Sequence, residues 1–391
     1  MAEPNLSPAC FTEYNEQTQS SLFSLLPPEI RYEIFAYALT SAPDTRQQPE
    51  RDGYCTRPGY ETPHRTYTEL LQTCRKIYME AWFMPFICSE HAFWMASSER
   101  VPERIITVEK MQQCLDLIHD RHGEVQGGHI RVFPQLWCLE GTEDFNGIFA
   151  MRHFYPKSVT ITIRYTDTWY WESNDELHIE GEWGRWLVLP SSVTRFCIDI
   201  ESIERRKDEV DYIAGEMADR WRFQRADGTN MVAARADTSV SRWTGSSMLG
   251  GERWVRDEEA PGQLRYYFAT VTWRPSQEPL DDQGLNPPLE VDWIRPSTPD
   301  LGCNYIEEAD LDRLGISMTV PAEQAVAEYI ADRDRRRDDM DRMREAVEQT
   351  VRQVLPFAQR YEARALRTPR ARRPSDYDLD EEVEVPIWHW F

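Results

Sequence analysis

The stretch VTITIRYT, Val159 to Thr166, alternates aliphatic and polar side chains with the period of two that is typical of a β-strand. Two further stretches have strand character, VTRFCIDI at 193–200 and LRYYFATVTW at 264–273, and the shorter runs LHIE and WLVL lie between VTITIRYT and VTRFCIDI. Pro, Gly, Asn or Asp residues bound these segments, as they commonly do at strand ends. We therefore expect residues 101–275 to form a β-rich body.

Helical periodicity interrupts this body and precedes its main strands. Apolar residues recur at spacings of three and four in two stretches, Val108, Met111, Leu115 and Ile118 in the first and Val210, Ile213, Met217 and Trp221 in the second. Ahead of both, HAFWMA from His91 is expected to form a strand. The pattern indicates an α+β fold whose central β-rich body holds one or two helices.

The N-terminal part begins with residues 1–20, expected to be flexible, and then LPPEIRYEIFAYAL at 26–39, which predicts a short amphipathic helix. Pro28 suits the first turn of a helix, and Glu29 complements the positive end of its dipole. Residues 40–65 are polar and Pro-rich, which predicts a long loop. Thr66 and Glu69 then form a capping-box pattern that predicts a second helix, continuing until Pro85.

The C-terminal part is expected to contain a Pro-rich linker at 276–320 and a long charged helix at 321–367. A basic and then acidic tail follows at 368–391. The middle of the helix, ADRDRRRDDMDRMRE, is almost entirely charged. An apolar stripe nevertheless runs along it and requires a surface to dock on: Met340, Met343, Val347, Val351 and Val354.

Composition limits the classes of function. The 67 acidic and 44 basic residues give a formal charge of −23, which repels nucleic-acid backbones and disfavours nucleic acid as a partner. The sequence contains neither a signal-peptide pattern nor an apolar run of about 20 residues, so we expect no membrane association and a cytoplasmic or nuclear location. The eight Cys include no C-x-x-C pair and are expected to be reduced.

Three N-terminal stretches resemble a large group of fungal proteins that have an F-box-like N-terminal segment and a body of unknown function. These are LPPEIRYEIFAYAL, LLQTCRKIYMEAWFMPF at 70–86 and EHAFWM at 90–95. The resemblance continues through SVTITIRYTDTWYWES, LPSSVTRFCIDIES, WRFQRADG, RWVRDE and YYFATVTW, and covers most of residues 20–275. It implies that residues 21–100 form an F-box-like helical segment, but it identifies a lineage and not an activity.

An F-box binds the linker subunit of a cullin ubiquitin ligase, and the rest of its chain recruits a client. The resemblance implies that five residues would face the linker: Leu26, Pro27, Ile30, Ile34 and Leu39. This chain departs from ordinary F-boxes, whose short helices follow one another closely, because Thr66 lies 26 positions after Thr40. The other interpretation is that the first helix packs on the second as a cap of the body.

The search for catalytic signatures favours a protein that is not an enzyme. The sequence contains no G-x-x-x-x-G-K-[ST], G-x-G-x-x-G, G-x-S-x-G or H-E-x-x-H pattern, so we expect no catalytic residues and no cofactor. His119 and His122 are spaced to share a metal, but no Cys or carboxylate at zinc-ligand spacing accompanies them. We interpret them as a surface pair and expect no metal site.

Trp169 and Trp171 are candidates for an aromatic ligand surface. A strand through Trp169-Tyr170-Trp171 would place both Trp rings on one face, where they would stack on a sugar or anchor a peptide. Packing of the same rings in the core is the alternative.

Two function classes remain open for this protein. One is an adaptor that joins a ligase linker to a client, and the other is a stand-alone peptide- or glycan-binding module with structural N-terminal helices. The exposure of Ile30 and Ile34 distinguishes these two classes. A stand-alone module should bury both side chains, whereas an adaptor should leave part of that stripe exposed as an apolar patch.

Overall fold

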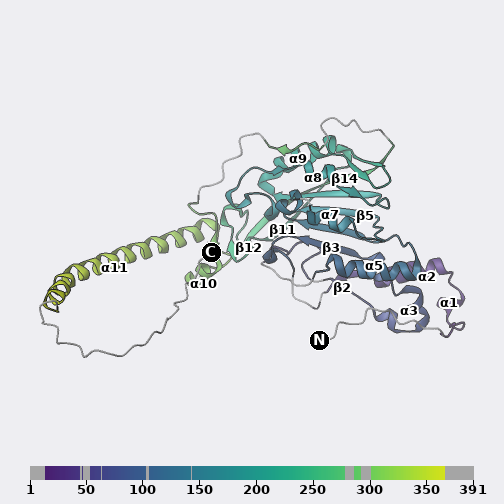
Figure 1. Ribbon diagram of the computed structural model, residues 1–391, viewed down its shortest axis with the longest axis horizontal. Helices are drawn as coiled ribbons and strands as arrows, with labels where there is room; N and C mark the ends of the chain where they lie inside the picture. The colour runs from purple at the N-terminus through teal and green to yellow at the C-terminus, as the bar shows by residue number, and fades with distance from the viewer. Residues whose placement is uncertain are drawn as a thin grey trace, which may run out of the picture. The chain divides into compact units, whose positions relative to one another are not determined.

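Figure 1 shows the computed structural model of the chain. The structure describes residues 14–44, 46, 53–62, 64–102, 105–141, 143–277, 286–291 and 301–365. The fold class is α+β, with N-terminal helices, a central sheet with helices, and a long C-terminal helix, as the sequence predicted. The chain divides into two compact units, residues 1–329 and 330–391.

The first unit is built on one mixed sheet that curls into a half-barrel. Eight of its strands follow one another in the order β3 (Glu90–Met95), β4 (His129–Pro134), β5 (Ser158–Ile163), β8 (Arg195–Ile203), β14 (Gln263–Ser276), β10 (Asn230–Ala233), β9 (Phe223–Arg225) and β7 (Val188–Leu189). A ninth strand, β11 (Ser239–Ser246), pairs with β14 beside β10. The main strands that the sequence predicted, β3, β5, β8 and β14, all belong to this sheet.

The direction of pairing changes in the middle of the sheet. Strands β3, β4, β5 and β8 are parallel neighbours, whereas β14 runs antiparallel to β8 and to β10. Parallel strands need crossover connections, and helices supply them here. Helix α5 (Val108–His122) joins β3 to β4, and helices α6 (Leu136–Glu140) and α7 (Glu143–Phe149) join β4 to β5.

The remaining elements of the described chain are further helices, 3-10 turns and three small sheets. The other α-helices are α1 (Ser21–Ser24), α2 (Pro28–Leu39), α3 (Arg75–Ala81), α4 (Met84–Cys88), α8 (Glu182–Trp186), α9 (Lys207–Arg220), α10 (Glu308–Leu314) and α11 (Ala322–Ala365). Single 3-10 turns lie at Glu69–Gln72, Ser98–Arg100, Tyr165–Asp167, Trp171–Ser173, Glu204–Arg206, Arg235–Asp237 and Val255–Asp257. Three small sheets pair β1 (Ser41–Pro43) with β2 (His64–Thr66), β6 (His178–Ile179) with β15 (Leu289–Glu290), and β13 (Glu252–Arg253) with both β12 (Met248–Leu249) and β16 (Ile306–Glu307).

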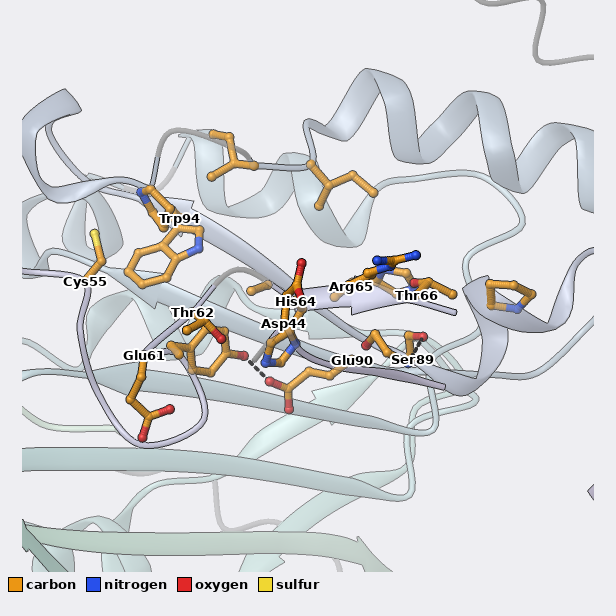
Figure 2. Close-up of a pocket in the computed structure, with 18 of the residues that line it drawn as sticks. Asp44, Cys55, Glu61, Thr62, His64, Arg65, Thr66, Ser89, Glu90 and Trp94 are labelled. Atoms are coloured by element: carbon orange, nitrogen blue, oxygen red, sulfur yellow. Dashed lines mark hydrogen bonds between the residues drawn. The ribbon is translucent and has the colours of Figure 1, made fainter. Parts of the chain in front are cut away.

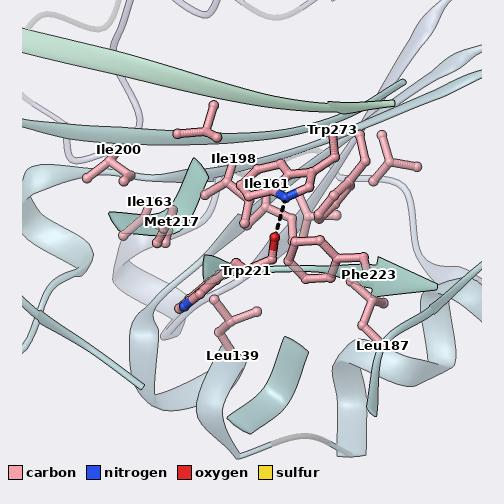
Figure 3. Packing of buried hydrophobic residues seen from close by; sticks show 14 of the residues in the cluster. Leu139, Ile161, Ile163, Leu187, Ile198, Ile200, Met217, Trp221, Phe223 and Trp273 are labelled. Carbon is pink, nitrogen blue, oxygen red and sulfur yellow. Dashed lines mark hydrogen bonds between the residues drawn. The ribbon is translucent and has the colours of Figure 1, made fainter. Parts of the chain in front are cut away.

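The main core lies between one face of the sheet and the helices. In β5, Val159, Ile161 and Ile163 point to this side because alternate strand residues share a face. They join buried residues of α5, α6, α7 and α9 in one cluster. Figure 3 shows Ile161, Trp221 and Trp273 packed together, with the Trp273 indole N–H donating to the Trp221 carbonyl at 2.9 Å.

Residues 276–320 are not the linker that their Pro content predicted, as far as they are described. Leu289 and Val291 are buried in the main core, and Leu289 pairs with Ile179. The Asn286 side chain is also buried and exchanges hydrogen bonds with the Arg222 backbone N–H and carbonyl. The described residues 286–291 belong to the body, since Leu289 and Val291 are part of its main core.

The second predicted helix is broken into three pieces. Thr66 does not cap a helix but pairs with Ser41 between β1 and β2. A 3-10 turn, α3 and α4 follow in succession, and Pro85 lies in the first turn of α4 instead of ending a helix. Strand pairing with residues 41–43 therefore overrides the local capping pattern.

Candidate protein-interaction surface

Helix α2 packs on the other N-terminal helices through one narrow face. Pro28 occupies its first turn and Glu29 lies beside the positive end of its dipole. Phe35 and Leu39, one turn apart, are buried against Ile77, Ala81 and Met84 of α3 and α4. The apolar residues of this face thus form a small core of their own.

The opposite face of α2 carries apolar side chains that contact solvent. Ile30 is 47% exposed, Ile34 42% and Tyr37 91%. These positions, i, i+4 and i+7, form one stripe along the helix. The stripe lies on the opposite side of the helix axis from Phe35 and Leu39. Leu25, 76% exposed, lies just ahead of the helix. We call these four residues the α2 surface.

The structure divides the five residues that the F-box resemblance singled out. Ile30 and Ile34 belong to the α2 surface, and Pro27 is exposed at the start of the helix. Leu26 is half-buried, and its carbonyl accepts a hydrogen bond from Arg31 at 2.9 Å. Leu39 is fully buried in the small core, so its side chain is not available to a partner in this conformation. Tyr37 and Leu25, which the sequence reasoning omitted, are the most exposed members.

The orientation of α2 is fixed by an ion pair as well as by its small core. The Arg31 guanidinium donates from Nε and Nη2 to the two carboxylate oxygens of Glu80, at 3.0 and 3.1 Å. Such a two-point contact fixes direction as well as distance. The α2 surface is therefore presented on a positioned helix.

The segment 53–62, which the sequence predicted as part of a polar loop, docks on the face of the sheet opposite the main core. Arg57 is buried there, 3.2 Å from the Glu201 carboxylate, and its guanidinium lies over the rings of Phe133 and Phe268. Tyr60 donates a hydrogen bond to Glu90. This segment links the N-terminal helices to the body.

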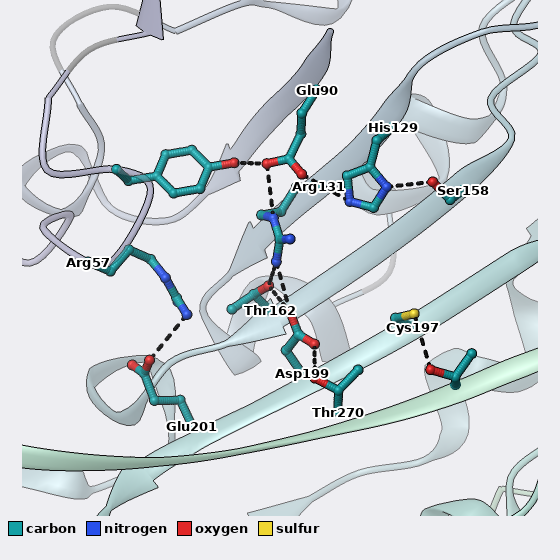
Figure 4. Close-up of polar contacts among 12 residues, drawn as sticks. Arg57, Glu90, His129, Arg131, Ser158, Thr162, Cys197, Asp199, Glu201 and Thr270 are labelled. Atoms are coloured by element: carbon teal, nitrogen blue, oxygen red, sulfur yellow. Dashed lines mark hydrogen bonds and ion pairs between the residues drawn. The ribbon is translucent and has the colours of Figure 1, made fainter. Parts of the chain in front are cut away.

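A partly buried charge network continues from this contact across the sheet. Figure 4 shows Arg131 between two carboxylates, 3.0 Å from Glu90 and 2.8 Å from Asp199. Burial acts to raise the pKa of the Glu90 carboxyl, but Arg131, Tyr60 and His129 together hold it below its usual range. Burial lowers the pKa of His129, with Glu90 acting in the opposite direction. Each charge has a partner, as expected of a network that stabilises a fold.

Trp169 and Trp171 do not form the common face that a strand would have given them. Tyr170, between them, has a left-handed backbone with φ 51°, and Trp171 begins a 3-10 turn. Trp171 is buried against Tyr165 and Trp254, whereas Trp169 is 38% exposed. Core packing therefore applies to Trp171.

Trp169 remains partly exposed, beside the carboxylate of Glu140. Its indole N–H donates to Glu140 at 2.6 Å, and the Glu180 backbone N–H donates to the same carboxylate at 3.0 Å. Burial raises the pKa of Glu140 in spite of these hydrogen bonds.

The histidine pair is separated by its packing. His119 stacks on His153 with ring centroids 3.6 Å apart, while His122 packs against Phe83 at 4.1 Å. Within the described ranges no cluster of three or more His, Cys, Asp or Glu residues has a geometry suited to a metal ion. No helix in the described part of the chain is long and apolar enough to cross a membrane.

The apolar stripe of the long helix lies in the second unit. Met340 and Met343 are 69% and 68% exposed, and Val347 and Val351 are exposed as well. The side chain of Val354, the basic cluster beyond residue 365 and the acidic tail lie outside the described residues.

Comparisons of this chain with family models, with curated proteins and with solved structures found no match.

Proposed function

We propose that this protein is a non-catalytic interaction protein whose α2 surface binds a partner protein. The F-box-like resemblance makes the linker subunit of a cullin ubiquitin ligase the expected partner, with the half-barrel body recruiting a client. The observation that carries the proposal is the apolar stripe Ile30, Ile34 and Tyr37, which faces solvent on the side of α2 opposite its core. Contiguous exposed apolar side chains are typical of protein contacts.

The alternative is a stand-alone peptide- or glycan-binding module in which the N-terminal helices are only structural. That alternative requires Ile30 and Ile34 to be buried, and 47% and 42% of their surfaces are exposed. The exposure favours the adaptor. The docked segment 53–62 also accounts for the departure from ordinary F-box spacing, because it places an anchor to the body between the two helical parts.

A pull-down of the purified linker subunit by the full-length protein tests the proposal. We expect binding at micromolar concentration, and a loss of about tenfold or more for Ile34→Asp, because a charge would enter an apolar contact. Val240→Asp is the matched control, since Val240 is 46% exposed on β11, away from α2. Circular dichroism should show both variants folded, because neither side chain belongs to a core. Failure of the unmodified protein to bind the linker would refute the adaptor function.

A further inference from the structure

Strand β3 forms one edge of the main sheet. Along it, the backbone N–H and C=O groups of successive residues point alternately toward β4 and away from it. The Ser89 and Met95 carbonyls accept hydrogen bonds from the His129 and Gln135 N–H groups, on the side of β4. Alternate residues of a strand direct their backbone N–H and C=O groups to the same neighbouring strand, so those of residues 91 and 93 also point to β4. Glu90, Ala92 and Trp94 consequently present their N–H and C=O groups to the opposite edge.

That outer edge has no strand beside it among the described residues, since β3 pairs with β4 alone. A cavity of about 710 Å³ lies along it instead. Its lining includes Glu90, Ala92 and Trp94 on β3 and, on the other side, residues 64–66 of β2. Figure 2 shows Trp94 and Ser89 toward opposite ends of the cavity, with Arg65 and Thr66 near the Ser89 end. The volume falls in the range of ligand sites, roughly 300–1,000 Å³.

We propose that this cavity binds an extended peptide segment of a partner protein, which adds to the sheet as a strand beside β3. Unpaired N–H and C=O groups at strand spacing are complementary to the backbone of another strand, and main-chain hydrogen bonds then supply affinity for any sequence. A rounded small molecule does not match that row of donors and acceptors. The site is separate from the α2 surface and goes beyond the function proposed above.

The side chains around the cavity specify what the peptide should carry. At one end the Trp94 ring stacks on Phe133 at 4.2 Å and Tyr60 stands edge-on to both rings, which makes an apolar wall together with Ile105 and Ile106. The one carboxylate that lies on β3 in this cavity, Glu90, is already paired with Arg131 and His129. We therefore expect an apolar peptide residue opposite Trp94 and no requirement for a basic residue opposite Glu90.

Selection from a phage-displayed library of random 12-residue peptides against the purified full-length protein provides the probe. The best peptide is then synthesised with a single N-methyl group at each backbone nitrogen in turn, and affinities are measured by fluorescence anisotropy. Strand addition predicts losses of about fivefold or more at every second position, each worth about one hydrogen bond. Selection of no peptide, or losses without this alternation, would overturn the proposal.

A substitution in β3 provides a second test of the proposal. Ala92→Pro removes an outward N–H that no β4 carbonyl uses, and edge strands tolerate proline at such positions. We expect unchanged circular dichroism and about tenfold weaker binding of the peptide. Ile34→Asp should bind the peptide as well as the unmodified protein, which separates this site from the α2 surface. Full affinity of Ala92→Pro would contradict the proposal.

If Ala92→Pro does not fold, hydrogen exchange on the unmodified protein decides the question. The amides of residues 90–95 should exchange more slowly when the peptide is bound, because those of Ala92 and Trp94 become paired. Unchanged exchange there would place the peptide elsewhere and reject strand addition.

Discussion

Helices α2 and α9 have similar lengths, 12 and 14 residues, but use their apolar side chains differently. Every aliphatic residue of α9 is buried against the sheet: Val210, Ile213, Ala214, Met217 and Ala218. Helix α2 buries Phe35 and Leu39 and leaves Ile30, Ile34 and Tyr37 in solvent. The fold buries every aliphatic side chain of α9, although Tyr212 is 41% exposed, but it buries only part of those of α2, and the excess on α2 is what a partner would cover.

The largest test of this contrast replaces one isoleucine in each helix. Ile213 is fully buried, so Ile213→Ala should lower the free energy of unfolding by about 4 kcal/mol, from lost burial and the cavity left behind. Ile34→Ala removes the same atoms from an exposed site and should cost about 0.5 kcal/mol or less. Urea denaturation followed by circular dichroism measures both. A cost for Ile34→Ala near that of Ile213→Ala would mean that the α2 surface is core.

An intermediate effect is expected where the two regions are joined. Arg57→Ala leaves the Glu201 carboxylate buried without its guanidinium partner, which should cost about 3 kcal/mol and loosen segment 53–62. Limited proteolysis should then cut within 53–62 before the body. Arg65→Ala is the control, because its pair with Glu69 is exposed and such pairs contribute little. Resistance of Arg57→Ala to the protease would show that the helices are held to the body by other contacts.

The smallest effect concerns pH. The pKa of Glu90 is lower in the folded protein than its ordinary value of 4.5, so the carboxylate stabilises the fold above that pH. This contribution is lost as pH falls through the folded pKa. Urea unfolding from pH 7 down to pH 3 should therefore show a smaller loss of stability for Glu90→Gln than for the unmodified protein. If the two proteins lose stability equally as the pH falls, Glu90 does not contribute to the acid sensitivity of the fold.

Local pattern was sufficient to predict the elements whose side chains repeat with a regular period. Strand β5 was predicted because aliphatic and polar residues alternate along it, and helix α9 because its apolar residues recur with a period of 3.6. The parallel pairing of β3, β4, β5 and β8 was not predicted, since strand order depends on contacts between distant segments. The 3-10 turn at Trp171 was missed because it depends on the left-handed Tyr170, which no residue type there signals.

The candidate surfaces were predictable to different degrees. Ile30 and Ile34 could be singled out from the helical pattern and the F-box-like resemblance, but which stripe of α2 is buried depends on where α3 and α4 pack. The cavity beside β3 could not be predicted, because β2 lies at the end of a segment that looks only polar in sequence, and helices α3 and α4 separate it from β3 along the chain. Arg57 looks like an ordinary surface charge until Glu201 of β8 is brought to it.

The contact between Arg57 and Glu201 has a consequence for biosynthesis. The N-terminal helices leave the ribosome early, whereas Glu201, the anchor of segment 53–62, is translated much later as part of β8. Strand β14, which pairs with β8, is translated later still. Domains generally fold during synthesis as their parts become available, and contacts between distant residues form slowly. The nascent helices can bury Phe35 and Leu39 among themselves, but segment 53–62 has no anchor until β8 is made, so it should become ordered later than the helices on either side of it.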